Sequence, residues 1–196
     1  MDIILAGVGG QGVLSLAGII ASSAMKAGLH VKQSEVHGMS QRGGAVMAHL
    51  RMSDAPVHSD IIGKGDADLI LAMEPVESLR YLDYLSRDGS LITNTAPFVN
   101  IPDYPDVESL LEQIGRLPRA VLVDAEKLAK SAGSPRAANM VLVGAASHLQ
   151  PVPLEIIENG VRELFAAKGD VMVRINLDAL RAGREAFERQ ASRTSN

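Results

Sequence analysis

Apolar residues along this chain follow two different periods, and the two kinds of segment alternate. The runs at 2–6 and 67–73 are short and almost continuously apolar, which is typical of strands buried on both faces of a sheet. Other short segments have the composition of extended chain between turn residues. We predict strands at 2–6, 30–35, 45–52, 67–73, 90–95 and 119–125.

The segments between the strands carry apolar residues at helical spacing, and three of them have terminal signals. Gly28 is placed to end the first helix, Pro75 suits the first turn of the second, and Asn176 is placed to cap the last. We predict helices at 11–28, 75–85, 106–117, 136–149, 153–169 and 177–190.

This order of elements predicts the fold class. Alternating strands and helices indicate an α/β fold, a three-layer Rossmann-like domain with a largely parallel sheet, followed by a helical C-terminal part. A length of 196 residues suits a single domain. We expect residues 1–190 to form that domain and residues 191–196 to be a frayed tail.

Composition narrows the classes of function. A net charge of −4 argues against nucleic acid as a partner, because binding to phosphates needs a basic surface. The chain has no cysteine, which excludes a Cys nucleophile and Cys-ligated iron–sulfur clusters in this chain. It shows neither a signal peptide nor an apolar run that could span a membrane, so we expect a cytoplasmic protein.

A glycine-rich motif follows the first predicted strand. Gly7, Gly9 and Gly12 satisfy G-x-G-x-x-G, Gly10 adds another position without a Cβ, and Gln11 offers an amide at the mouth of the loop. Glycines here allow close backbone approach, while N–H groups at a helix N-terminus attract an anion such as a phosphate. We predict an anion or cofactor site at this loop, with tight strand–helix packing as the alternative.

The motif alone does not establish a dinucleotide. A ribose-binding acid is expected roughly 20 residues beyond the glycines, and Glu35 is the candidate at that distance. Glu35 also begins a second polar motif, so its role stays open between the two. A free-standing dinucleotide-binding enzyme or sensor therefore remains the alternative function.

The second motif, at 35–46, is polar and rich in glycine. Arg42 offers a planar fork for a carboxylate or phosphate, and Glu35 could orient Arg42 or His37. For His37 a structural hydrogen bond is favoured over proton transfer. We predict the edge of a site, or a surface facing a partner, formed by Glu35, His37, Gly38, Ser40, Gln41, Arg42, Gly43 and Gly44.

No catalytic or metal-binding constellation accompanies these motifs. His37, His49 and His58 are spaced by 12 and 9 residues, which matches no short ligand motif. The nucleophile elbow G-x-S-x-G does not occur. We assign no catalytic residue and no metal ligand to this chain.

The two motifs together carry a family resemblance. "AGVGGQGV" followed by "SEVHGMSQRGGAV" resembles the gamma subunit or gamma domain of 2-oxoacid:ferredoxin oxidoreductases. The segments "DADLILAMEPVESLRYL", "NTAPF" and "AANMVLVGA" fit as well, so the resemblance covers most of the chain. Within the family, a short chain with "HGMSQRGG" is most similar to the beta subunit of indolepyruvate ferredoxin oxidoreductases.

The resemblance implies a subunit with little or no activity alone. The reaction it implies is oxidative decarboxylation of a 2-oxoacid with coenzyme A as co-substrate, giving acyl-CoA, CO2 and reduced ferredoxin. It places thiamine diphosphate (TPP) and [4Fe–4S] clusters on a larger partner subunit, through which ferredoxin is reached, and no cofactor on this chain alone. A purely structural docking module is a further alternative, in which both glycine motifs serve backbone packing.

Overall fold

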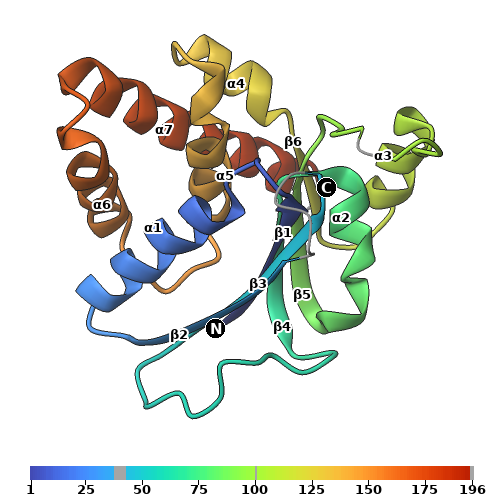
Figure 1. Ribbon diagram of the computed structural model, residues 1–196, viewed down its shortest axis with the longest axis horizontal. Helices are drawn as coiled ribbons and strands as arrows, with labels where there is room; N and C mark the ends of the chain where they lie inside the picture. Colours follow the sequence, from blue (N-terminus) through green and yellow to red (C-terminus); the bar gives the residue numbers. More distant parts are fainter. Residues whose placement is uncertain (38–42, 100, 195–196) are drawn as a thin grey trace.

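The computed structural model describes residues 1–37, 43–99 and 101–194, and in this part a six-stranded sheet lies between two layers of helices (Figure 1). The strands are β1 (Asp2–Val8), β2 (His30–His37), β3 (Ala45–Ser53), β4 (Ala67–Ala72), β5 (Leu85–Asn94) and β6 (Ala120–Val123). The α-helices are α1 (Val13–Lys26), α2 (Pro75–Arg80), α3 (Val107–Gly115), α4 (Ala125–Ser131), α5 (Ala138–Ala146), α6 (Leu154–Ala166) and α7 (Asp170–Thr194). Two 3-10 turns are η1 (Leu82–Tyr84) and η2 (Pro135–Ala137).

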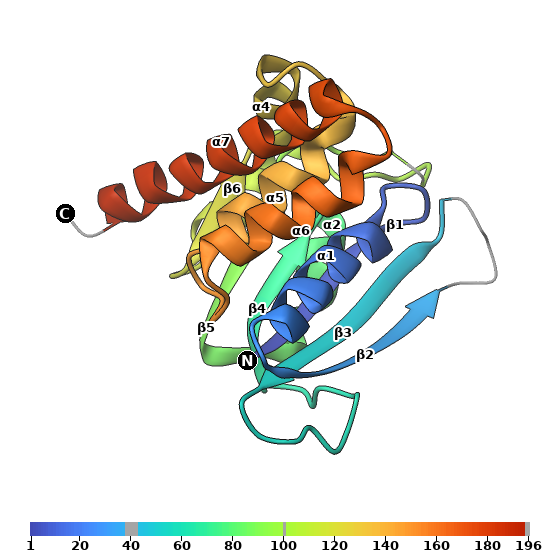
Figure 2. The same cartoon turned by 90° about the vertical axis from the view of Figure 1, so that its left-hand side faces the viewer.

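The strand order is β2-β3-β1-β4-β5-β6. β1, β4, β5 and β6 pair in parallel, whereas β3 is antiparallel to both of its neighbours, β1 and β2. The α/β class and the largely parallel sheet are therefore confirmed. β2 is not the direct neighbour of β1 after the β1–α1–β2 crossover, because β3 lies between them (Figure 2).

The alternating side chains of β1 divide the core between the two faces of the sheet. Ile3 and Leu5 pack with α1, α5 and the other C-terminal helices, while Ile4 packs on the opposite face toward α2 and α3. All three side chains are fully buried. The continuously apolar pattern of this strand is explained by helices on both sides.

Several boundaries differ from the sequence prediction. The helix beginning at Pro75 ends at Arg80, and β5 already begins at Leu85, where the sequence predicted the end of that helix. The helix α4 was not predicted, because its seven residues are too few to show a helical period. Asp124 caps it by accepting a hydrogen bond from the Lys127 N–H at 3.0 Å.

The last helix begins earlier than the sequence predicted. α7 starts at Asp170 and continues through Thr194, into the stretch 191–196 that was expected to fray. The prediction that Asn176 caps this helix is wrong. Its side-chain N–H donates to the carbonyl of Met172 one turn earlier, at 2.8 Å, so Asn176 lies inside the helix. Among the described residues, no helix combines the length and apolarity needed to cross a membrane.

Two glycines allow α5 and α7 to approach closely. A Cβ on Gly144 would overlap the backbone of Leu180, and a Cβ on Gly183 would overlap the backbone of Val141. Residues of larger volume would force these helices apart. The close packing holds the C-terminal helices over the sheet, on the same face as α1 (Figure 1).

Candidate functional site

The carboxyl ends of β1 and β4 form the topological switch point of the sheet. From β1 the chain continues into α1 on one face, and from β4 it continues into α2 on the other. The two strands are adjacent and parallel. Open α/β sheets bind ligands in the crevice where the connections from two neighbouring strands go to opposite faces of the sheet. The glycine loop lies at this edge, because it joins β1 to α1.

The backbone of the loop requires glycine at three positions. Gly10 and Gly12 have φ angles of +105° and +85°, in the left-handed region that glycine adopts without strain. Gly7 has no room for a side chain, because a Cβ there would lie 2.7 Å from Cγ2 of Val13 and 3.0 Å from Cβ of Met73. Tight strand–helix packing therefore contributes to the glycine pattern.

The amide of Gln11 holds the loop against two strands. Its Oε1 accepts a hydrogen bond from the N–H of Val8 at 2.8 Å, and its Nε2 donates to the carbonyl of Met73 at 3.2 Å. Val8 ends β1, and Met73 follows β4 directly. Gln11 thus bridges the crevice between these strands instead of projecting from the mouth of the loop.

The structure joins the two motifs directly. The N–H of Gly9 donates to the carbonyl of Gly44 at 2.8 Å, and the N–H of Gly43 donates to the carbonyl of Gly9 at 3.3 Å. Gly43 has a φ of +77°, which glycine adopts without strain and residues with a side chain adopt only rarely. The end of the second motif is therefore anchored on the first.

The middle of the second motif lies outside the described residues. This applies to Gly38, Ser40, Gln41, Arg42 and the side chain of His37, whose roles remain predictions.

Glu35 is exposed on β2 and is paired with Ala48 of β3. Because β3 separates β2 from β1, the two strands are roughly 10 Å apart, twice the usual spacing of neighbouring strands. This separation disfavours Glu35 as a ribose-binding acid for the glycine loop.

Glu74 is a buried acid at this edge that the sequence analysis missed. Its side chain accepts hydrogen bonds from the N–H of Glu77 at 2.8 Å, from the N–H of Phe98 at 3.4 Å and from the hydroxyl of Tyr104. Burial of Tyr104, followed by its hydrogen bond to Glu74, raises the pKa of the phenol well above its usual range. Glu74 thereby caps α2 and ties the chain after β5 to the switch point.

Asn94 is a second buried polar residue at this edge of the sheet. Its Nδ2 donates to the carbonyl of Met73 at 3.3 Å, the same carbonyl that accepts from Gln11, and its Oδ1 accepts from the N–H of Ala125 at 3.1 Å. The signal for both missed residues was in the sequence. Glu74 and Asn94 are polar residues at the carboxyl ends of apolar strands, where parallel strands meet.

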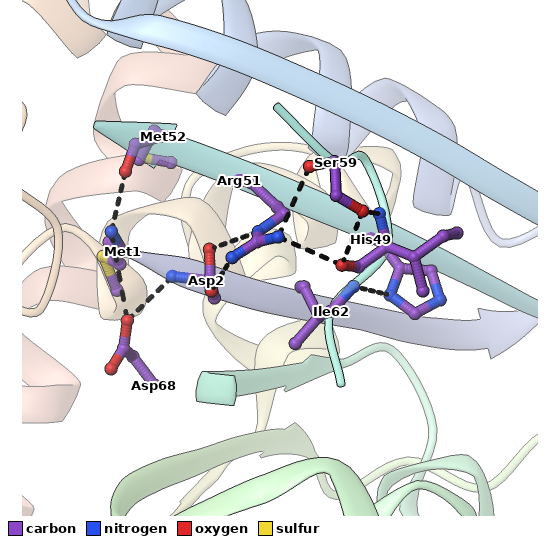
Figure 3. Close-up of polar contacts among 9 residues, drawn as sticks. Met1, Asp2, His49, Arg51, Met52, Ser59, Ile62 and Asp68 are labelled. Carbon is purple, nitrogen blue, oxygen red and sulfur yellow. Dashed lines mark hydrogen bonds and ion pairs between the residues drawn. The ribbon is translucent and has the colours of Figure 1, made fainter. Parts of the chain in front are cut away.

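His49 serves the fold and not the switch point. It is buried, and its Nδ1 accepts a hydrogen bond from the N–H of Ile62 at 3.2 Å (Figure 3). Arg51 holds the same loop through the carbonyls of Ser59 and Ile61 and is paired with Asp2. Within the described ranges, no group of three or more His, Cys, Asp or Glu side chains is arranged to hold a metal ion.

The sequence matches a known family along nearly its full length. The model of the family "Pyruvate ferredoxin/flavodoxin oxidoreductase" matches residues 2–186. The indolepyruvate oxidoreductase subunit IorB of Archaeoglobus fulgidus is 38% identical over 192 residues, which cover 93% of each chain. These matches confirm the family resemblance drawn from the two glycine motifs.

Solved structures share the fold. The gamma subunit of a keto/oxoacid ferredoxin oxidoreductase from Geobacter sulfurreducens is 25% identical with a TM-score of 0.69, over 96% of this chain and 98% of that one. The 2-oxoglutarate:ferredoxin oxidoreductase of Magnetococcus marinus is 22% identical with a TM-score of 0.77. In that protein the match covers 96% of this chain but 31% of the longer one.

Proposed function

Because the chain belongs to the pyruvate ferredoxin/flavodoxin oxidoreductase family, we propose that it is the small subunit of an enzyme that oxidises indolepyruvate or related aryl pyruvates. Whatever its specific substrate, the chain is a subunit of a 2-oxoacid:ferredoxin oxidoreductase. In the proposed reaction, a 2-oxoacid and coenzyme A react with two oxidised ferredoxins. The products are an acyl-CoA, CO2, a proton and two ferredoxins that are each reduced by one electron.

One observation supports indolepyruvate or a related aryl pyruvate as the substrate. The similarity to an indolepyruvate oxidoreductase subunit extends over 93% of both chains at 38% identity. A match that runs from end to end supports an equivalent place in an equivalent assembly. It supports the aryl preference through the relative's name, and the pocket for the aryl group is proposed to lie in the partner.

The cofactors are proposed to lie on a larger partner subunit. Iron–sulfur clusters are held by cysteine thiolates, and this chain has no cysteine, so its residues do not fit a [4Fe–4S] cluster. We assign the clusters and TPP to the partner, and ferredoxin is reached through it. The longer Magnetococcus marinus chain, in which the equivalent region is about a third of the length, supports a unit that works beside others.

This chain is proposed to contribute the edge of the site where coenzyme A approaches. The exposed Gly10, the left-handed Gly12 and the first turn of α1 present backbone N–H groups that can bind an anionic group. Arg42 is proposed to bind a carboxylate or phosphate. The Magnetococcus marinus enzyme, which supports this assignment by its fold alone, was solved with coenzyme A and succinyl-CoA bound.

Reconstitution tests the proposal. The chain is purified alone and together with the proposed larger partner subunit, and CoA-dependent reduction of ferredoxin is measured with indolepyruvate and with pyruvate. We expect turnover by the complex, preference for the aryl substrate, and no turnover by either chain alone. Full turnover by this chain alone would refute the subunit role, and preference for pyruvate would refute only the assignment of substrate.

Replacing Arg42 separates a site edge from a docking module. We expect R42A to lower the turnover of an intact complex about tenfold or more, since a hydrogen bond to a charged group contributes about 1.5–3 kcal/mol. R87A, which removes an exposed arginine on β5, is the matched control. An unchanged rate in R42A with intact assembly would support the docking module instead.

Calorimetry tests the alternative function. We expect NAD and FAD to show no micromolar binding to the isolated chain, because β3 separates Glu35 from the glycine loop. Micromolar binding of either dinucleotide would favour a free-standing nucleotide-binding protein.

A further inference from the structure

A groove of about 550 Å³ lies among the helices on the face of the sheet that carries α1. It is separate from the polar edge at Glu74 and Asn94, which do not line it. Four helices and η2 contribute to it, namely α1, α5, α6 and α7. Its lining residues are Ser15, Gly18, Ile19, Ser22, Arg136, Asn139, Met140, Gly160, Leu164, Phe165, Lys168 and Asn176.

The groove exists because one face of α1 carries small residues. Ser15, Gly18 and Ser22 lie three and four positions apart, so they share a side of the helix. A Cβ built on Gly18 would have no heavy atom within 4 Å, which shows that the space above it is open. Gly160 on α6 adds a further position without a side chain.

Four side chains give the groove an apolar part of its wall, namely Ile19, Met140, Leu164 and Phe165. Ile19 and Met140 are buried, and Phe165 is partly buried against the main core. Leu164 also lines the groove but is 51% exposed, a large fraction for a leucine on a helix that packs against the domain. Such walls stabilise the apolar body of a ligand by removing it from water.

Two cations at the groove have no carboxylate partner among the described residues. The Arg136 guanidinium takes part in no ion pair there, and the Lys168 ammonium lies over the Phe165 ring at 5.2 Å from its centre. Glu163 is the acid of α6 that is nearest to Lys168 in the sequence. It is paired with Lys26 of α1 instead. The groove therefore has positive charge that its own walls do not neutralise.

We propose that this groove binds a small organic anion with an apolar aromatic or aliphatic body. Its volume lies within the range of small-molecule sites, about 300–1,000 Å³. Arg136 and Lys168 bind the anionic group, and Ile19, Met140 and Phe165 surround the body. This ligand site goes beyond the subunit role, since it requires neither the partner nor its cofactors.

The groove also contacts the glycine loop. Asn139, one of its lining residues, donates a hydrogen bond from Nδ2 to the carbonyl of Gly12 at 3.1 Å. Gly12 is the N-cap of α1 and belongs to the loop at the switch point. A ligand in the groove therefore lies one side chain away from the proposed coenzyme A edge.

The test uses 1-naphthylacetate as the anionic probe and 1-naphthaleneacetamide as its neutral counterpart. Binding to the purified full chain and to the assembled complex is followed by ligand-observed NMR and calorimetry. We expect saturable one-to-one binding of the acid to both preparations, and at least about tenfold weaker binding of the amide, because the amide lacks the charge that Arg136 and Lys168 recognise.

Three variants locate the binding. G18L fills the open space above α1 and is expected to weaken binding at least about tenfold without lowering the thermal midpoint. The double variant R136Q/K168Q is expected to weaken binding of the acid similarly while leaving that of the amide unchanged. K127Q, which removes an exposed lysine of α4, is the control and is expected to bind like the wild type.

Three outcomes would overturn the proposal. The first is no saturable binding of the acid at millimolar concentration. The second is binding that is equal for the acid and the amide, or that is unaffected by G18L and R136Q/K168Q. The third is binding to the isolated chain that is lost in the complex, which would make the groove a protein interface. Each can be observed whether or not the complex oxidises indolepyruvate, so failure here is distinguishable from failure of the proposed function.

Discussion

Gly9 and Gly44 are joined by a backbone hydrogen bond of 2.8 Å, although they lie 35 residues apart in the chain. The N–H of Gly43 returns a second bond to the carbonyl of Gly9 at 3.3 Å. The loop after β1 is thus joined to Gly43 and Gly44, the residues that directly precede β3. This pairing places the glycine pair at the end of the second motif beside the carboxyl end of β1.

Gly43→Ala tests the importance of that pairing. A Cβ at Gly43 meets nothing within 4 Å, but its φ of +77° is strained for alanine by about 1–2 kcal/mol. We expect the free energy of unfolding, measured by urea titration, to fall by about that amount. We also expect the turnover of the complex, measured by ferredoxin reduction, to fall. G18A, in helical backbone with open space, is the control and should be neutral or stabilising by about 0.5–1 kcal/mol. Equal effects of the two changes would contradict this explanation.

Gln11→Ala tests the bridge across the switch point. The change leaves the N–H of Val8 and one interaction of the Met73 carbonyl unsatisfied, which costs about 1–3 kcal/mol. We expect a lower thermal midpoint and weaker coenzyme A binding by the complex. Q11E should not restore stability at neutral pH, because a carboxylate accepts from Val8 but cannot donate to Met73. Q113A, on the exposed side of α3, should change stability by less than about 0.5 kcal/mol.

His49 makes stability depend on pH. Burial is the main cause that lowers the pKa of this imidazole, partly opposed by Asp60, so His49 takes up a proton at lower pH in the folded protein than in the unfolded chain. The unfolded chain binds a proton near pH 6.5. The contribution of His49 to stability is therefore present above pH 6.5 and is lost as the pH falls toward the lowered pKa of His49 in the folded protein.

His49→Gln is expected to flatten this dependence. Urea unfolding at pH 8, 7, 6 and 5 should show a smaller loss of stability below pH 6.5 than in the wild type, by at most about 1.4 kcal/mol per pH unit. H58Q, which changes an exposed histidine, should keep the wild-type dependence. A wild-type slope in H49Q would show that other groups cause the loss.

Gln190→Ala is expected to expose the β6 edge of the sheet. The side chain of Gln190 on α7 accepts from the N–H of Leu122 at 3.0 Å and donates to the carbonyl of the same residue, as a neighbouring strand would. We expect a loss of about 1–2 kcal/mol and greater self-association, measured by urea titration and light scattering. R189A, one position earlier, removes an exposed ion pair and should change neither property.

The periodic pattern of the sequence was sufficient for the fold class. Runs such as 2–6 and 67–73 report that both faces of a strand are buried, and that requires helices on both sides of a sheet. The pattern could not predict the order of the strands in the sheet, because no local signal shows whether β2 or β3 is the neighbour of β1. Asn176 was misassigned for a similar reason, since asparagine favours a helix cap but also bonds to the carbonyl one turn earlier inside a helix.

The kinds of element, the position of the glycine motif after β1, the absence of cysteine and the family resemblance can all be read from the sequence. These follow from local period and residue identity. The position of β3 between β1 and β2, the pairing of Gly9 with Gly44 and the hydrogen bond from Tyr104 to the buried Glu74 follow from the tertiary structure alone. Such contacts depend on the path of the whole chain, since hydrogen bonds between segments dozens of residues apart form only when the packed layers bring those segments together.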